Sequence, residues 1–403
     1  MPSFPPGRRF VLPVIRLIVV LSGLLSGVHA FALTESEWKA VRPIREARLA
    51  DDLPRALLYA NNVIKLAPQL AEAYEERAQI LRATGDLPGA RRDLDRVLDL
   101  QPKSRTALAL RARVRLEQSD YEGAIADAAV AGRSEEMLNV HGEALMALNR
   151  YREALEDFKI LRGGSFGPNT NSRFPYALCL FALGDVAGAV PWFETEITDG
   201  GLIEAHRMLV LGLCLLGRHD EAEKRLASWM ETAAKPAPTD DYDRYLWTSL
   251  HDNRDEAVLL SAVVRYARAD FTGAVAVLDR IEKGSDQADQ ARLLRHAALL
   301  RSGHPDDGLK NAGEPKDAWT QVVRRYLLGG ISDKELLAKT EDTTDFAERR
   351  RRECEAGFYA GQKRLAAGDD LAASLLFEKA AATRMISLPE YILTQIALGK
   401  AGN

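Results

Sequence analysis

The 403-residue sequence is poor in the residues from which disulfide-bonded or redox-active folds are built. It contains three cysteines, Cys179, Cys214 and Cys354, and none of them belongs to a CxxC pair. An odd number of dispersed cysteines argues against a disulfide framework. Cys179 and Cys214 lie in apolar segments, which favours buried free thiols; a disulfide between these two residues is the alternative.

Motifs for catalysis, metal binding and cofactor binding are also missing. The seven histidines are scattered without an HExxH or similar spacing, and the sequence has no GxSxG segment, no phosphate-binding glycine loop and no dinucleotide-binding fingerprint. We therefore expect no enzymatic activity, no cofactor and no bound metal. An active site assembled from distant segments is the alternative that these motifs do not address.

The chain also has no excess of positive charge, because its formal net charge is −4. The one basic run, Arg349–Arg352, is flanked by Glu348 and Glu353, and we interpret it as a solvated helix face. This balance argues against nucleic acid or anionic lipid as a partner.

No run of alternating apolar residues extends beyond a few positions, which predicts an all-helical chain. What the sequence does contain is a period: Ala56, Ala90 and Ala124 are each 34 residues apart, and Pro68 and Pro102 follow the first two alanines by 12 residues. A fixed spacing of this length is typical of a helical repeat array, in which each unit contacts only its neighbours.

The clearest unit runs from Ala71 to Pro102 and resembles a tetratricopeptide repeat (TPR). In it Ala78 on the first helix is expected to face Ala90 on the second, and Gly85-Asp86-Leu87 is expected to turn the chain. The same turn recurs along the chain, each time followed by a small residue that we call the anchor. These anchors are Ala124, Ala154, Ala189, Ala222, Ala274, Gly308 and Ala373. The resemblance implies an all-α, TPR-type solenoid of about eight or nine irregular helix pairs.

The spacing between anchors also predicts how the array is divided. The step from Ala222 to Ala274 is 52 residues long and contains the break Lys235–Pro238, followed by a predicted short helix near Tyr242–Leu250. This break is the best candidate for a hinge or sub-domain boundary. We predict an N-terminal TPR array at residues 31–232, a second TPR segment with the inserted helix at 233–315, and a C-terminal TPR and capping module at 316–403.

The first 30 residues resemble a secretory signal peptide. Three arginines precede the apolar run Leu17–Val28, and Val28 and Ala30 supply the small residues at a cleavage site. Twelve helical residues span about 18 Å, less than the hydrocarbon core of about 30 Å, so a cleaved signal is favoured over an uncleaved anchor. The pair Arg8-Arg9 leaves a twin-arginine signal as a minor alternative. We expect a periplasmic protein that begins at Phe31, without stable membrane insertion after cleavage.

The C-terminal third carries a second resemblance. The segments WTQVV from Trp319, YLLGGISDKELL from Tyr326 and CEAGFYAG from Cys354, followed by Glu390-Tyr391, are similar to the closing module of bacterial TPR lipoproteins of the new-lipoprotein-I (NlpI) type. The similarity covers about residues 316–399. It implies an envelope adaptor that brings murein hydrolases to a protease, and it is compatible with a homodimer. The chain departs from that family by lacking a cysteine for lipid attachment.

A TPR array of this kind is expected to bind a protein or peptide on the concave surface formed by its first helices. The repeat positions that line this surface are Glu72, Glu75, Gln79, Arg82, Thr106, Arg113, Asn139, Glu143, Met146, Phe174, Phe181 and Arg207. Glu75 and Ala109 replace the basic residues with which chaperone-binding TPRs hold a C-terminal carboxylate. The sequence therefore predicts a non-enzymatic interaction scaffold for a partner with basic and hydrophobic parts; the alternative is an accessory structural subunit of an envelope enzyme or export complex.

Overall fold

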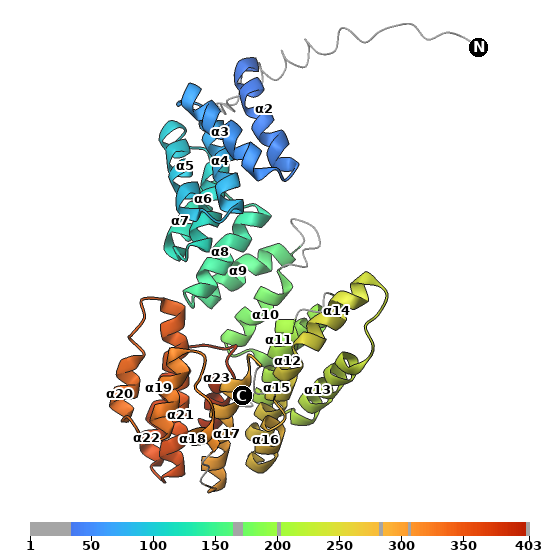
Figure 1. The fold of residues 1–403 in the computed structure, drawn as a ribbon, viewed down its shortest axis with the longest axis vertical. Coiled ribbons are helices and arrows are strands. Elements are labelled where there is room, and N and C mark those ends of the chain that lie inside the picture. Colours follow the sequence, from blue (N-terminus) through green and yellow to red (C-terminus); the bar gives the residue numbers. More distant parts are fainter. Residues whose placement is uncertain (1–33, 164–171, 200–202, 282–284, 305–307, 400–403) are drawn as a thin grey trace, which may run out of the picture. The chain divides into compact units, whose positions relative to one another are not determined.

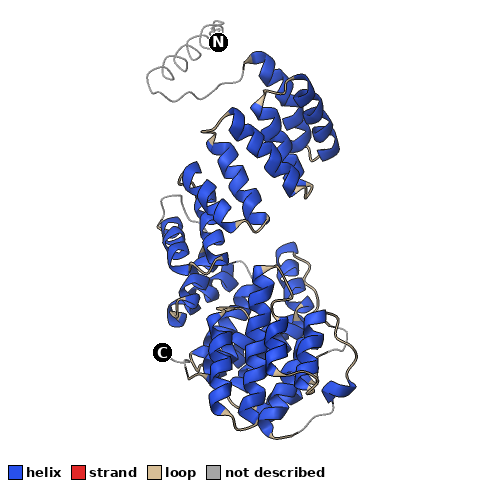
Figure 2. Ribbon diagram, turned by 90° about the vertical axis from the view of Figure 1, so that its left-hand side faces the viewer, coloured by secondary structure: helices blue, strands red, loops and turns tan. Residues whose placement is uncertain are grey.

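The computed structural model describes residues 34–399 except 164–171, 200–202, 282–284 and 305–307 (Figure 1). Every regular element in this described part is a helix, and it contains no strand (Figure 2). The chain divides after Gly132 into two compact units, called the N-terminal and C-terminal units below. The predicted signal segment and its cleavage site lie outside the described residues.

The N-terminal unit consists of three helix hairpins. Their helices are α2 (Glu35–Leu49) with α3 (Leu53–Leu66), α4 (Ala71–Ala83) with α5 (Leu87–Leu100), and α6 (Arg105–Glu117) with α7 (Tyr121–Ala131).

The C-terminal unit continues the hairpins and adds other helices. Its elements are α8 (Glu135–Ala147), α9 (Tyr151–Arg162), α10 (Arg173–Ala182), α11 (Val186–Asp199), α12 (Ile203–Leu215), α13 (His219–Ala234), α14 (Asp241–Asp252), α15 (Arg254–Ala267), α16 (Phe271–Leu278), α17 (Ala288–Ser302), α18 (Gly308–Asn311), α19 (Ala318–Leu327), α20 (Asp333–Lys339), α21 (Phe346–Ala366), α22 (Asp370–Ala382) and α23 (Pro389–Ala397). The expected all-helical repeat architecture is confirmed.

The turn of each repeat hairpin contains a residue with left-handed backbone geometry. These residues are Asp51, Gly85, Ser119, Asn149, Gly184, Gly217, Ala269, Gly303 and Gly368, with φ between 58° and 92°. Glycine adopts this region without strain, whereas other residues pay a steric penalty there. The turn geometry is thus kept even where the sequence offers alanine or serine.

An aspartate that follows the left-handed residue starts several of the second helices. In the second hairpin the Gly89 N–H donates to Asp86 Oδ1 at 2.8 Å. A Cβ atom on Gly89 would lie 2.3 Å from Asp86 Oδ2, so a residue larger than glycine would clash with the carboxylate that caps the helix. The same D-x-x-G arrangement recurs at Asp120, Asp185 and Asp270. It marks the start of a second helix from sequence alone.

Small residues let the paired helices approach closely, as the repeat pattern predicts. Ala78 and Ala90 are both fully buried in one hydrophobic cluster of the N-terminal unit. In the last hairpin, a Cβ atom on Gly357 would lie 2.8 Å from the Leu376 carbonyl oxygen, and one on Gly361 would lie 2.4 Å from the Phe377 ring. The glycines of the CEAGFYAG segment therefore permit the close packing of α21 on α22.

The segment around Lys235–Pro238 connects the packed helices α13 and α14. The predicted short helix is confirmed as α14. The Trp229 indole of α13 donates to the Leu250 carbonyl at 3.0 Å, and the Trp247 indole donates to the Lys235 carbonyl at 2.8 Å. The break thus lies inside the C-terminal unit, whereas the division into units falls after Gly132. The finer boundaries at 232 and 315 stay predictions.

None of the described helices combines the length and apolar character needed to cross a membrane.

Candidate protein-binding surface

The residues predicted to bind a partner in the N-terminal unit lie mainly on α4. Glu72, Glu75, Gln79 and Arg82 follow one another at intervals of three or four residues, so they share one face of the helix. Glu72, Glu75 and Gln79 are half-buried and Arg82 is exposed. We call these four residues the α4 face.

Ion pairs fix α4 between its neighbours. Glu76, only 2% exposed, accepts hydrogen bonds from Arg45 and, at 3.0 Å, from Arg48, both on α2. On the other side, Arg82 Nε donates to Glu117 of α6 at 2.8 Å. The flanking hairpins therefore hold the α4 face in place.

Glu75 is the unusual member of the α4 face. Its side chain makes no hydrogen bond to any described residue, although its neighbour Glu76 uses both carboxylate oxygens. Burial raises the pKa of Glu75 to about 7, and the nearby carboxylates of Glu76 and Glu72 add to this effect, while Arg45 and Arg48 oppose it. Glu75 is thus a partly desolvated carboxyl group whose charge Arg45 and Arg48 offset only in part.

Aromatic and amide groups border this carboxylate cluster. The indole of Trp38, 40% exposed on α2, lies 5.5 Å from the Arg45 guanidinium, measured to the ring centroid. Glu72 accepts a 3.3 Å hydrogen bond from the Gln101 side chain. The sequence interpretation missed Trp38, Arg45 and Arg48, because they lie on α2, before the units from which it selected positions. It also missed Glu76, which is on α4 but is not one of the repeat positions that it chose.

Arginines on the first helices connect successive hairpins in the N-terminal unit. Arg77 forms a bidentate pair with Asp93, with both contacts at 2.7 Å, and reaches Asn61 at 2.8 Å. One repeat later, Arg111 binds Asp127 bidentately at 2.7 Å and Asp95 at 2.8 Å. Each arginine therefore joins the second helix of its own hairpin to that of the preceding one. Such charge-assisted pairs hold neighbouring hairpins in a defined arrangement.

Five other predicted residues lie on two more first helices, α6 in the N-terminal unit and α8 in the C-terminal unit. On α6, Thr106 is exposed and Arg113 is half-buried, one repeat after Glu72 and Gln79. In the C-terminal unit, Asn139 and Met146 of α8 are half-buried, and Glu143 is exposed. Their role in binding stays a prediction.

Three predicted residues of the C-terminal unit are engaged within the fold. Phe181 is 3% exposed and lies in the core, so the expectation that it faces solvent is wrong. Its ring fits against Gly212 of the next first helix, where a Cβ atom would lie 3.3 Å away. Phe174 is half-buried and packs 5.8 Å from Phe193 between ring centroids. Arg207 forms a 2.7 Å ion pair with the buried Glu256.

The basic run Arg349–Arg352 is also more engaged than the sequence indicates. Arg351 pairs with Glu348 and with the buried Glu355, at 2.8 and 2.7 Å. Arg350 Nε donates to the Thr383 carbonyl at 2.9 Å, and Arg352 pairs with Glu348 at 2.7 Å. The interpretation as a solvated helix face is therefore wrong, because all four arginines are half-buried and Arg350 connects α21 to the residue that ends α22.

The cysteines are buried free thiols, as the apolar contexts favoured. Burial raises the pKa of both Cys179 and Cys214 to about 12, so neither is a reactive thiolate at neutral pH. No cluster of three or more histidine, cysteine or carboxylate side chains among the described residues has the geometry of a metal site.

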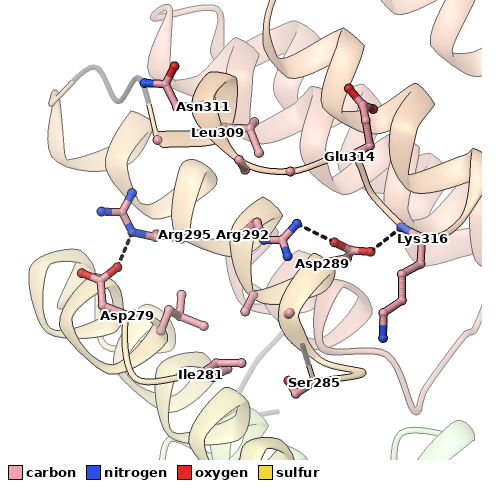
Figure 3. A pocket seen from close by; sticks show the side chains of 16 residues that line it. Asp279, Ile281, Ser285, Asp289, Arg292, Arg295, Leu309, Asn311, Glu314 and Lys316 are labelled. Atoms are coloured by element: carbon pink, nitrogen blue, oxygen red, sulfur yellow. Dashed lines mark hydrogen bonds and ion pairs between the residues drawn. The ribbon is translucent and has the colours of Figure 1, made fainter. Parts of the chain in front are cut away.

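A cavity of about 550 Å³ lies between α16, α17 and the segment around α18 (Figure 3). Its charged side chains pair with one another: Arg292 contacts Asp289 at 2.7 Å, and Arg295 contacts Asp279 at 2.7 Å. The Lys316 backbone N–H donates to the other Asp289 oxygen at 2.9 Å. This mutual pairing gives the cavity no distinct chemical preference, so the α4 face is the stronger candidate site.

Comparisons with known proteins address the family of the chain. Residues 47–115 and 139–201 each match a family model described as tetratricopeptide repeat. The comparison with curated proteins gave no match. Similar solved structures include YrrB, titled a TPR protein with an unusual peptide-binding site, at 19% identity and a TM-score of 0.36, covering 42% of this chain and 89% of that one. A tetratricopeptide repeat protein from Parabacteroides merdae is similar at 16% identity and a TM-score of 0.46, covering 66% of this chain and all of the other. The two family matches and the repeated hairpins show that the chain contains tetratricopeptide repeats, which indicate a scaffold for protein–protein interaction.

Proposed function

We propose that this chain is a non-enzymatic periplasmic adaptor that holds a basic segment of a partner protein on the α4 face. The observation that carries the proposal is Glu75, a half-buried carboxyl group without a hydrogen-bond partner in the described structure. A lysine or arginine from a partner would supply the missing positive charge. Charge-assisted hydrogen bonds of this type are about twice as strong as neutral ones.

The surroundings of Glu75 favour a protein segment over a small molecule. The α4 face belongs to a helix surface, and Trp38 offers an exposed aromatic ring beside Arg45, which pairs with Glu76. Large aromatic side chains next to a charged group are common anchors at protein interfaces. Because Phe181 belongs to the core, the apolar part of the predicted groove in the C-terminal unit is not supported.

A panel of labelled peptides of equal length tests this function. The peptides differ in charge, and their affinities are measured at pH 8 for the parent chain, Glu75→Gln and Asp99→Asn. Asp99 is exposed on α5, the second helix of the same hairpin, so Asp99→Asn removes an equal charge away from the α4 face. We expect basic peptides to lose about tenfold in affinity with Glu75→Gln, and less than twofold with Asp99→Asn. Equal losses with both variants, or a preference for acidic peptides, would contradict the proposal.

The proposed periplasmic location depends on the signal-like features of residues 1–30. Removing them takes away three arginines and no acidic residue, and so moves the formal net charge from −4 to −7. N-terminal sequencing of the exported protein should return Phe31 as the first residue. Membrane-bound protein that begins at Met1 would instead support an uncleaved anchor.

The resemblance of residues 316–399 to NlpI-type proteins, together with the homodimer and the murein-hydrolase role that it implies, stays a prediction. Sedimentation equilibrium of the mature chain tests the homodimer directly.

A further inference from the structure

The last helix, α23, is enclosed by the rest of the C-terminal unit. It contacts α12, α15, α21 and α22, which come from three different hairpins (Figure 1). Pro389, Glu390, Ile392, Leu393 and Thr394 are all buried. A helix buried around most of its circumference behaves as part of a core.

Most of the helices around α23 are the first helices of their hairpins. These are α12, α15 and α21, and Gln290 of the first helix α17 also reaches α23. First helices form the surface with which a TPR array holds its ligand. In the C-terminal unit, a segment of the chain itself therefore occupies the surface on which a ligand would lie.

The carboxylate of Glu390, in the first turn of α23, holds this helix in place through hydrogen bonds. Glu390, 1% exposed, accepts hydrogen bonds from Gln290 Nε2 at 3.1 and 3.2 Å and from the Tyr359 hydroxyl at 2.9 Å. Its place at the N-terminal end of the helix is favourable for a negative charge. The contacts form a site built for one acidic side chain at the start of a helix.

The fit of α23 in this site is incomplete. The Thr394 side chain is fully buried, yet its hydroxyl oxygen makes no hydrogen bond within the described part of the chain. A buried polar group without a partner weakens the packing of the helix that carries it. A second acidic group, Glu355, also lies near Glu390; burial and the Glu390 charge raise its pKa to about 7.

We propose that the inner surface of the C-terminal unit is a second protein-binding groove, which α23 blocks in the free protein. The groove accepts from a partner a short helix with a carboxylate in its first turn and aliphatic residues after it. The partner helix replaces α23, whose sequence PEYILTQIA is the template for the ligand.

Exchange of α23 with a peptide tests this proposal on the full chain. The probe is a labelled peptide with the sequence of residues 386–399, and its affinity is measured for the parent chain, Glu390→Ala and Glu378→Ala. Glu390→Ala weakens the internal occupant and leaves the groove intact. Glu378→Ala is the matched control, because Glu378 is exposed on α22. We expect the peptide to bind Glu390→Ala at least tenfold more tightly than the parent chain or the control.

Two further arms make the outcome unambiguous. A peptide that itself carries the Glu390→Ala change should bind at least tenfold more weakly than the unchanged peptide. Thr394→Val in the chain should improve the fit of α23 and reduce peptide binding below that of the parent chain. The proposal is overturned if the peptide binds all chains equally, or if circular dichroism shows that Glu390→Ala unfolds the chain, since α23 would then be a structural core element. Glu75→Gln should not affect this binding, so the result is independent of the α4 face.

Discussion

Replacing Glu75 by glutamine should stabilise the protein at alkaline pH. Between the ordinary pKa of 4.5 and the raised value of about 7, the folded chain binds more protons at Glu75 than the unfolded chain does. The free energy of unfolding therefore falls as the pH rises through this window. Glu75→Gln removes this titration, so the variant keeps the stability that the parent chain loses.

The size of the effect follows from the same interval. At about 1.4 kcal/mol per pH unit, the difference between 4.5 and about 7 corresponds to at most about 3.4 kcal/mol. Glu75 is only half-buried, so solvent screens part of the repulsion from its neighbours. We expect a gain of about 1–2 kcal/mol at pH 8.5 and almost none at pH 5.

The assay is urea unfolding at both pH values, combined with hydrogen exchange of the α4 amides to assign the effect to the N-terminal unit. Glu76→Gln is the matched control, since Glu76 is adjacent but holds Arg45 and Arg48. It should destabilise the chain by about 2–3 kcal/mol, because it weakens a buried ion pair. A Glu75→Gln variant that is less stable than the parent chain at pH 8.5, or shows the same difference at both pH values, would refute the reasoning.

Three other predictions concern the repeat architecture. A Cβ atom on Gly85 would meet no atom within 4 Å, so Gly85→Ala should lower the free energy of unfolding by about 1 kcal/mol through its left-handed backbone geometry alone. Ala269 has the same backbone geometry, so Ala269→Gly should raise the free energy of unfolding by up to about 1 kcal/mol. Shifts of the melting temperature in the same direction for both variants would contradict this. Arg77→Ala leaves the buried Asp93 without its bidentate partner and should cost about 3 kcal/mol in urea unfolding, and a loss below about 1 kcal/mol would count against the role of these arginine pairs. Ala90→Leu should overpack the contact between α4 and α5 and cost about 1–3 kcal/mol, so unchanged melting would speak against this packing.

Local features of the fold could be predicted from the sequence because they depend on residues close together in the chain. The turn before Asp86 and the small residues Ala78 and Ala90 all lie within one 34-residue unit. The structure places each of them as the repeat pattern requires. Local geometry and the close approach of two adjacent helices need no information from the rest of the chain.

Features that depend on distant residues could not be predicted in this way. The contact between Gln290 and Glu390 joins residues 100 positions apart, and no periodicity indicates it. The repeat position of Phe181 alone predicts that it lies on the surface. The glycine that makes room for its ring, Gly212, lies in the next first helix. That glycine within an apolar helix was the one available sign of a close approach.

The pH dependence of peptide binding tests the central claim about the α4 face most directly. The affinity of a lysine-containing peptide is measured between pH 6 and 8.5, where lysine stays charged. The account predicts that affinity rises as the pH passes about 7 and Glu75 ionises, and that the rise is absent in Glu75→Gln. An affinity that does not change with pH in the parent chain, or an identical rise in Glu75→Gln, would show that Glu75 does not hold the partner.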